Sequence, residues 1–198
     1  YRLENNRFTL DRIHNHDVPR AIAEARYGLI IADELYTKPA AYKSVERVFL
    51  FRQQLFLMAE RNDPLAIRDE ISASELGGLT LIGPADPLGI KDWLMEIDRF
   101  NCCSTMISLN CSTSLFETEW ETIRWPFLIS SFGFARTAQR PWWNSRKAIR
   151  VTGEYTERDI YLWYDGRVKK ERAPEIRLIL SNAEQIRRED SDWSGGLL

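Results

Sequence analysis

Polar residues suited to ligand binding stand at the ends of short apolar segments, each just before a segment of helical character. A helix N-terminus offers unpaired N–H groups and a partial positive charge, which suit a carboxylate or a similar anion. Ligands of α/β proteins also bind beyond the carboxyl ends of strands. We therefore expect an anion-binding pocket at three such places: His14 and Asn15 after segment 8–13, Gly83, Pro84 and Asp86 after segment 79–82, and Ser112 and Ser114 after segment 106–109. A simpler interpretation is that Asp17 and Ser114 only cap helices.

The histidines and cysteines do not form a recognisable site. His14 and His16 stand two residues apart, and because the chain has only these two histidines, no metal site is predicted. Cys102, Cys103 and Cys111 are an odd number without a disulfide framework, which fits a reducing compartment. They are either a redox sensor or buried inert thiols, and the lack of a neighbouring basic cluster favours inert thiols.

Aromatic and basic side chains leave two further alternatives open. One group could form an aromatic wall for a ligand or pack in a core or dimer interface: Trp120, Trp125, Trp142 and Trp143. Another group could hold an anion, although an exposed, solvated face is the expected arrangement: Arg140, Arg146 and Arg150. Motifs for a nucleophile elbow or a phosphate-binding loop are lacking, so neither an enzyme nor a cofactor is expected.

Composition restricts the class of protein. The 198 residues, 44% hydrophobic and 28% charged, are typical of a globular chain. Lys and Arg number 27 against 29 Asp and Glu, and this net charge of −2 argues against a direct grip on a nucleic-acid backbone. No apolar run reaches the length of a membrane-spanning helix, so we expect a cytoplasmic protein without a membrane partner.

Hydrophobic spacing predicts alternating strands and helices, and hence an α/β fold. Strands are expected at 8–13, 29–32, 47–51, 54–59, 79–82, 106–109, 149–152 and 159–164, with Arg52 and Gln53 separating the third from the fourth. Helices are expected from Pro19 to near Gly28, at 90–100, through Trp120 to Ile123, and at 174–188, and Ser72 to Glu75 has capping-box spacing. The unit from 8 to 32 predicts a parallel strand pair with a right-handed crossover.

Three stretches resemble the effector-binding (substrate-binding) domain of LysR-type transcriptional regulators. The most specific is QQLFLMAERNDPLAIRDEISASELGGLTLIG, residues 53–83, with its Asp-Pro-Leu-Ala turn and apolar hinge strand. A second stretch, residues 25–33 (ARYGLIIAD), resembles the helix-then-strand segment of this family with its Asp-containing apolar strand, and here the Asp is Asp33. The third, residues 149–166 (IRVTGEYTERDIYLWYDG), resembles the returning strand of the family. Ser130 begins the segment that stands where the family has a Gly-x-Gly turn.

The resemblance implies a type 2 periplasmic-binding-protein-like fold, with two Rossmann-like sub-domains joined by two crossover strands. Residues 1–81 and 162–198 would form sub-domain I, and residues 82–161 would form sub-domain II. The first strand and helix of the family are expected to be missing. An effector, expected to be an anionic or aromatic organic acid, would bind between the lobes at His14, Asn15, Asp33, Gly83, Pro84, Asp86, Ser112, Ser114 and Ser130.

The same resemblance implies a non-enzymatic sensor that acts as a homodimer. DNA would be bound only through a helix-turn-helix domain that this chain lacks. The alternative is a solute-binding protein or an enzyme lobe of the same two-lobed fold. A third possibility is a domain that only assembles subunits.

Overall fold

The structure is a computed structural model, and it describes residues 17–33, 44–84, 105–109, 124–131 and 144–196. Its helices and strands, in chain order, are α1 (Val18–Ala23), β1 (Leu29–Asp33), β2 (Val45–Glu60), η3 (Pro64–Ile67), β3 (Glu70–Ser72), η4 (Ala73–Gly78), β4 (Thr80–Pro84), β5 (Thr105–Leu109), β6 (Phe127–Ser130), β7 (Arg146–Thr152), β8 (Glu157–Asp165), η6 (Gly166–Val168) and α5 (Ala173–Gly196).

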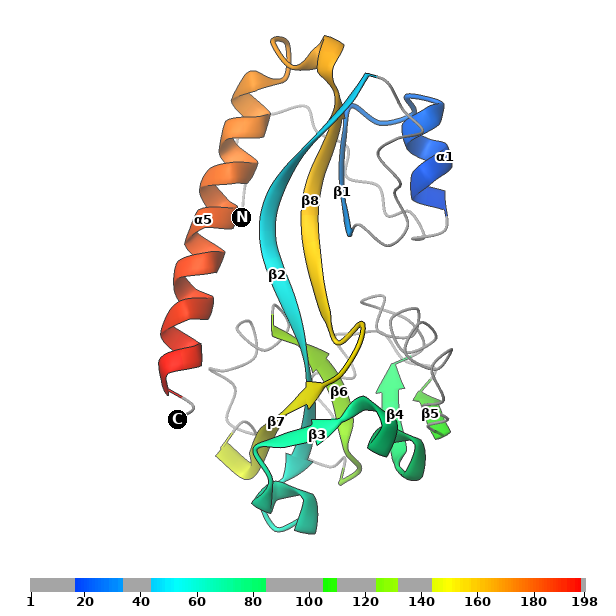
Figure 1. Cartoon of the computed structure of the whole chain (residues 1–198), viewed down its shortest axis with the longest axis vertical. Helices are drawn as coiled ribbons and strands as arrows, with labels where there is room; N and C mark the ends of the chain where they lie inside the picture. Colours follow the sequence, from blue (N-terminus) through cyan, green and yellow to red (C-terminus); the bar gives the residue numbers. More distant parts are fainter. Residues whose placement is uncertain (1–16, 34–43, 85–104, 110–123, 132–143, 197–198) are drawn as a thin grey trace.

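Strand β2 runs through both halves of the molecule and organises the sheet (Figure 1). The strand order is β1-β8-β2-β7-β3, with β6 also paired to β2, and β4 and β5 form a separate parallel pair. The first part of β2 pairs antiparallel with β8, and its last part pairs antiparallel with β6 and β7. We refer to the part containing β1, β8, α1 and α5 as the upper half, and to the part containing β3 to β7 as the lower half.

The predicted break between strands 47–51 and 54–59 is wrong, because β2 is one strand of 16 residues. Arg52 and Gln53 continue the ladder, opposite Asp159 and Arg158 of β8. The irregularity lies slightly earlier, as a register shift between Phe49 and Phe51. Polar residues can occupy the middle of this strand because Arg52 is exposed and Gln53 is only half-buried.

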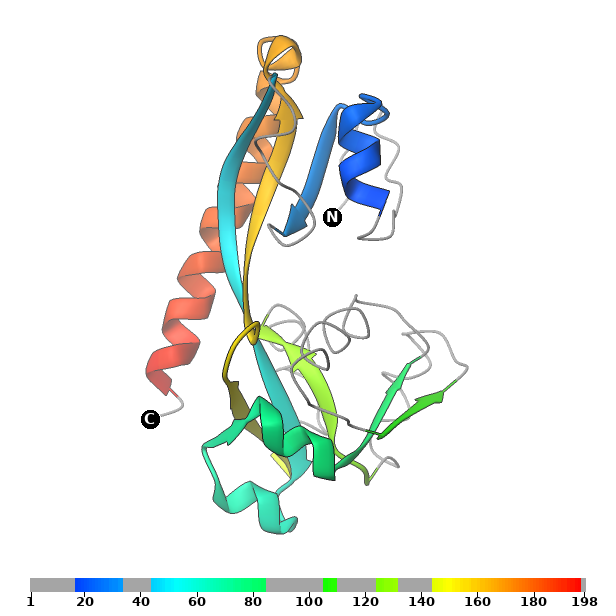
Figure 2. The same cartoon turned by 45° about the vertical axis from the view of Figure 1, so that its right-hand side comes forward.

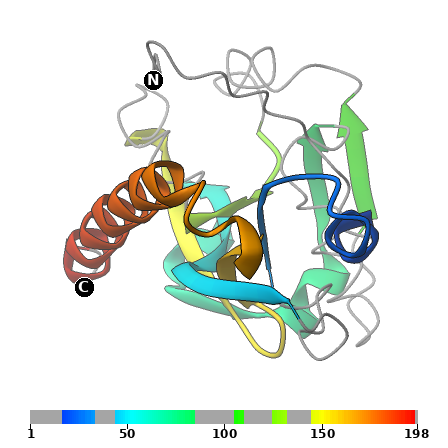
Figure 3. The ribbon, with the colours of Figure 1, turned by 90° about the horizontal axis from the view of Figure 1, so that it is seen from above.

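Among the residues that the structure describes, three clusters of buried side chains form the cores of the two halves. In the upper half, α5 packs Ile176 and Ala183 against Leu50 and Leu162, and α1 covers Trp163 on the other face of the sheet. Seen from above, α5 and α1 accordingly lie on opposite sides of β2 and β8 (Figure 3). The lower half has its own core, built from the last part of β2 and from β3, η4, β4, β6 and β7.

In the described part of the chain, two segments connect the halves, and the core cluster to which the buried residues belong changes within each of them. Along β2 the last residue packed in the upper core is Phe51, and the first in the lower core is Leu55. On the returning segment the change falls between Val151 and Ile160. The predicted sub-domain boundaries at residues 81 and 162 stay a prediction.

Other sequence predictions are met to different extents. The Ser72–Glu75 capping box is present: the Ser72 side chain accepts from the backbone, and the Glu75 carboxylate accepts from the Ser72 N–H at 2.9 Å. The first helix ends at Ala23, well before Gly28, and Ala25 has a left-handed φ of 47°. The final helix continues to Gly196, beyond its predicted end at 188. The expected elements at 8–13, at 90–100 and through Trp120 to Ile123 lie outside the described residues.

Candidate functional site

The carboxyl ends of three strands are directed toward the region between the two halves (Figure 2). Strand β1 descends from Leu29, opposite Tyr164, to Asp33, opposite Ile160 near the lower end of β8. Strand β6 ascends in the lower half and ends at Ser130, opposite Leu55. Strand β4 also ascends and ends at Gly83 and Pro84. Four of the predicted site residues therefore stand at strand ends that approach the same region from two sides.

Asp33 is held in a buried ion pair with Arg158. The Arg158 Nη1 atom donates to the Asp33 Oδ2 atom at 3.1 Å, and the two side chains are only 4% and 6% exposed. Next to this pair, the Trp163 indole N–H donates to the Ala32 carbonyl at 3.2 Å, which ties the end of β1 to β8. A buried guanidinium is suited to recognising carboxylates, and Asp33 supplies the compensating charge.

Ser130 and the next residue connect β6 to the middle of β2. Both Ser130 and Ser131 are 6% exposed. The Ser131 hydroxyl accepts a hydrogen bond from the Gln54 backbone N–H at 3.2 Å. The end of β6 is therefore fixed beside the point where β2 passes from one core to the other.

Gly83 and Pro84 are placed by the parallel β4–β5 pair. In that register Gly83 lies opposite Ser108 and Pro84 opposite Leu109. Parallel strands end at the same edge, so the C-terminal ends of β4 and β5 lie side by side. That the second and third predicted groups, at residues 83–86 and 112–114, lie close together stays a prediction.

The remaining predicted site residues lie outside the described residues: His14, Asn15, Asp86, Ser112 and Ser114. Both histidines and all three cysteines lie there as well. Among the residues that the structure describes, no three His, Cys, Asp or Glu side chains are grouped as a metal site would need. Within the same residues, no helix has the length and apolar character required to cross a membrane.

Two site residues were missed by sequence reasoning. Arg158 stands in an alternating segment, where a charged residue ordinarily faces water, and its partner Asp33 is 125 positions earlier. Gln54 makes contacts with residues about a hundred positions away, and a lone glutamine carries no motif.

Of the arginines expected on a solvated face, Arg146 departs from that expectation. It is 3% exposed, and its guanidinium lies 5.1 Å from the centre of the Phe127 ring. Burial lowers its pKa below the ordinary value, and the nearby Glu60 carboxylate opposes that shift. Arg150 is exposed, as expected, and Arg140 lies outside the described residues.

No protein-family model matches the chain, and no curated protein matches it. Solved structures do. The regulatory domain of MetR, a LysR family regulator from Neisseria meningitidis, matches with a TM-score of 0.58 at 16% identity, covering 86% of this chain and 74% of that one. A Corynebacterium glutamicum OxyR mutant matches with a TM-score of 0.63 at 15% identity, covering 91% of this chain and 56% of that one. Full-length CbnR in complex with target DNA matches with a TM-score of 0.56 at 12% identity, covering 91% of this chain and 59% of that one.

These matches support the resemblance found in the sequence and confirm the predicted fold class. At such identities they establish the fold, and what the named regulators bind is a property of those proteins. The chain has the periplasmic-binding-protein-like type 2 fold found in the regulatory domains of LysR-family regulators.

Proposed function

We propose that this chain is the effector-binding regulatory domain of a LysR-type transcriptional regulator, with no catalytic role. The observation that carries the proposal is the convergence of strand ends within this fold: Asp33 approaches from the upper half, and Pro84 and Ser130 approach from the lower half. A molecule held between them would contact both halves, and its differential affinity for their relative orientations would supply the signal.

The lobes of this sensor correspond to the upper and lower halves. We place their junction where the core clusters change, between Phe51 and Leu55 on β2 and between Val151 and Ile160 on the returning segment. With this division none of the three core clusters is split between the lobes.

The effector class is taken from the resemblance, which implies a small organic acid. The buried Arg158–Asp33 pair at the end of β1 has no net charge and does not by itself distinguish an anion from a cation. The regulator would act in the cytoplasm as a homodimer. Its DNA would be bound by a helix-turn-helix domain outside this chain. Sedimentation equilibrium of the chain is expected to give twice its mass.

Thermal shift with a panel of aliphatic and aromatic carboxylic acids tests the proposal. A ligand at 100 times its Kd stabilises the folded chain by about 2.7 kcal/mol, which is readily measured. Calorimetry on the hits should show that Ser130→Ala weakens binding at least about tenfold, since a lost hydrogen bond to a charged ligand costs about 1.5–3 kcal/mol. Ser181→Ala is the matched control, because Ser181 is exposed on α5.

The pocket assignment is contradicted if no acid in the panel binds the chain while the full-length regulator still responds to one of them in a reporter assay. Equal binding to parent and Ser130→Ala, with loss in Ser181→Ala, would place the site elsewhere.

A further inference from the structure

The two chain segments that connect the halves have different backbones. Strand β2 is continuous, whereas its partner is interrupted: Arg150 of β7 lies opposite Phe56, and Glu157 of β8 lies opposite Gln54. Only Leu55 separates these two pairing sites along β2, whereas residues 151–156 separate them along the returning segment. The start of this interruption pairs with β3 instead of β2, since Val151 and Thr152 lie opposite Ile71 and Ser72. A bend at this point can change the angle between the halves without breaking either core.

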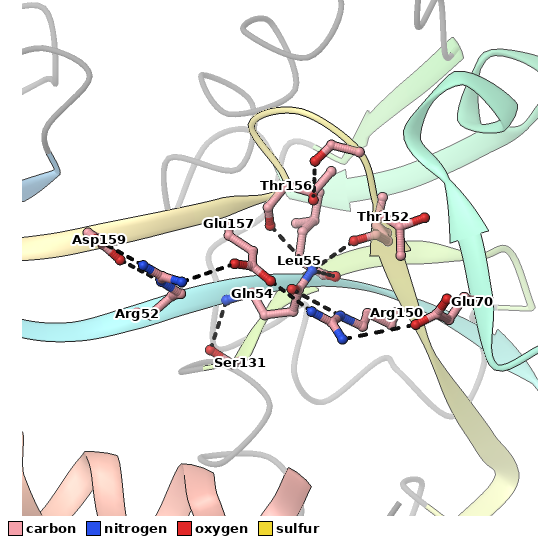
Figure 4. Close-up of polar contacts among 12 residues, drawn as sticks. Arg52, Gln54, Leu55, Glu70, Ser131, Arg150, Thr152, Thr156, Glu157 and Asp159 are labelled. Carbon is pink, nitrogen blue, oxygen red and sulfur yellow. Dashed lines mark hydrogen bonds and ion pairs between the residues drawn. The ribbon is translucent and has the colours of Figure 1, made fainter. Parts of the chain in front are cut away.

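Gln54 ties the interrupted strand to β2. Its Nε2 atom donates to the Val151 carbonyl at 2.8 Å and lies 3.3 Å from the Thr156 carbonyl, which also accepts from the Leu55 N–H. The Gln54 carboxamide thus reaches across the interruption to both of its ends (Figure 4).

Glu157 joins one arginine from each half. Its Oε2 atom is 3.4 Å from Nη1 of Arg52, and its Oε1 atom accepts from Nη2 of Arg150 at 2.8 Å. Arg52 is fixed on the upper side by two further bonds to Asp159, at 2.6 and 3.2 Å. Arg150 belongs to the lower side, where it also donates to the Gln54 Oε1 atom at 3.2 Å. We call Arg52, Gln54, Arg150 and Glu157 the polar clasp (Figure 4).

The charged members of the clasp are accessible to water. Arg52 is 60% exposed, Arg150 50% and Glu157 38%. Water can replace a partner of an exposed ion pair at small cost, so such a pair biases an equilibrium without locking it. A link of this strength across the interruption between β7 and β8 is suited to a reversible change of orientation.

We propose that the polar clasp holds the two halves in one relative orientation, and that opening the Glu157 link to Arg150 releases the second orientation used in effector sensing. This extends the proposed function, because it assigns the regulation of the same interlobe site. Breaking the link should raise the ratio of the second orientation to the first about two- to fivefold, the range expected for an exposed ion pair.

The experiment measures the distance between the halves in the absence of any effector. Spin labels are placed at Ile67→Cys in the lower half and Arg177→Cys in the upper half, both exposed positions, after Cys102, Cys103 and Cys111 are replaced by serine. Double electron–electron resonance then gives the distance distribution for the parent, Glu157→Gln, Arg150→Met and the double variant. Lys147→Met is the control, because it breaks the 2.8 Å pair with Asp69 inside the lower half.

Both single variants are expected to shift weight to a second distance, the double variant no further than either single one, and the control not at all. A salt titration to 1 M on the labelled parent should produce the same shift, since salt screens exposed pairs. An unchanged distribution in folded Glu157→Gln, an equal shift in Lys147→Met, or a parent insensitive to salt would each overturn the inference. Since no effector is present, these outcomes do not depend on whether the proposed effector site is correct.

Discussion

Replacing Gln54 by glutamate removes the side-chain hydrogen-bond donor at this position of the clasp while keeping the shape of the side chain. In the parent, Nε2 of Gln54 is 2.8 Å from the Val151 carbonyl oxygen, 3.0 Å from that of Leu55 and 3.3 Å from that of Thr156. An amide nitrogen carries two hydrogens, so the three acceptors share two bonds. A carboxylate would place an oxygen against these carbonyl oxygens instead.

The size of the effect follows from those contacts. Two part-buried hydrogen bonds contribute about 0.5–1.5 kcal/mol each, and leaving an acceptor unsatisfied costs about 1–3 kcal/mol. The pair formed with Arg150 offsets little of this, because Arg150 is exposed. We expect Gln54→Glu to lower the free energy of unfolding by about 3 kcal/mol at pH 7, which is a fall in Tm of about 6–12 °C for a chain of this size.

The deficit should depend on pH in a definite direction. A carboxyl facing carbonyl oxygens is favoured in its protonated form, in which it can donate one hydrogen bond. Its pKa in the folded variant is therefore raised above the ordinary value of about 4.3. The variant should approach the parent below about pH 4 and lose stability as the pH rises through the raised pKa.

Urea unfolding followed by tryptophan fluorescence at pH 7 and pH 3.5 provides the assay. The control is Gln53→Glu, which adds the same charge at a neighbouring half-buried position that takes no part in these contacts, and it should cost less than about 0.5 kcal/mol. Equal unfolding midpoints for Gln54→Glu and the parent at pH 7 would refute the role given to the carboxamide. A deficit that grows toward low pH would refute the assigned hydrogen-bond direction.

Three other perturbations have defined outcomes. The Arg68 guanidinium, followed by a backbone N–H, lowers the pKa of Glu75 from 4.5 to about 2, so its stabilising contribution is complete above pH 4.5 and is lost as the pH falls toward 2. The gap in Tm between the parent and Glu75→Gln should therefore close over that interval. Leu57 is fully buried in the lower core, so Leu57→Ala should lower the free energy of unfolding, measured by urea unfolding, by about 2–5 kcal/mol. Asp33→Asn and Arg158→Met should each destabilise the fold. Because the two buried side chains bond each other, a double-mutant cycle should give a coupling energy of about 2 kcal/mol between them. Strictly additive effects of the two substitutions would contradict the ion pair.

Local signals in the sequence were sufficient for most of the described elements. The Ser72 capping box forms within three residues, and its side-chain and backbone partners are all local, so the turn at η4 needs no tertiary information. The final helix follows equally directly, because Ile176 and Ala183 fall on one face of a regular helical pattern and become its buried residues. Its C-terminal end was less predictable, since polar residues continue a helix without any periodic apolar signal.

The candidate site depends on contacts between distant parts of the chain. Asp33 could be proposed only from resemblance, and the burial of Arg158 follows from a partner that the alternation of β8 does not reveal. The convergence of β1, β4 and β6 depends on strand order, which an apolar pattern leaves undetermined. The residue types thus indicated which side chains could bind a ligand, whereas the strand order determined which of them lie close together.

The incorrectly predicted strand break has a physical cause that connects it to the proposed function. Arg52, Gln53 and Gln54 interrupt an apolar pattern, and such an interruption normally indicates a turn. In this chain it falls where β2 leaves one core and has not yet entered the other, so these three residues belong to neither of the two described core clusters that β2 joins. The backbone remains extended because β8 supplies its hydrogen bonds, while the side chains are free to bind Asp159, Val151 and Glu157. A polar run inside a long strand is therefore the expected sequence signature of a segment that crosses between two cores, and the residues within it are those able to control the angle between them.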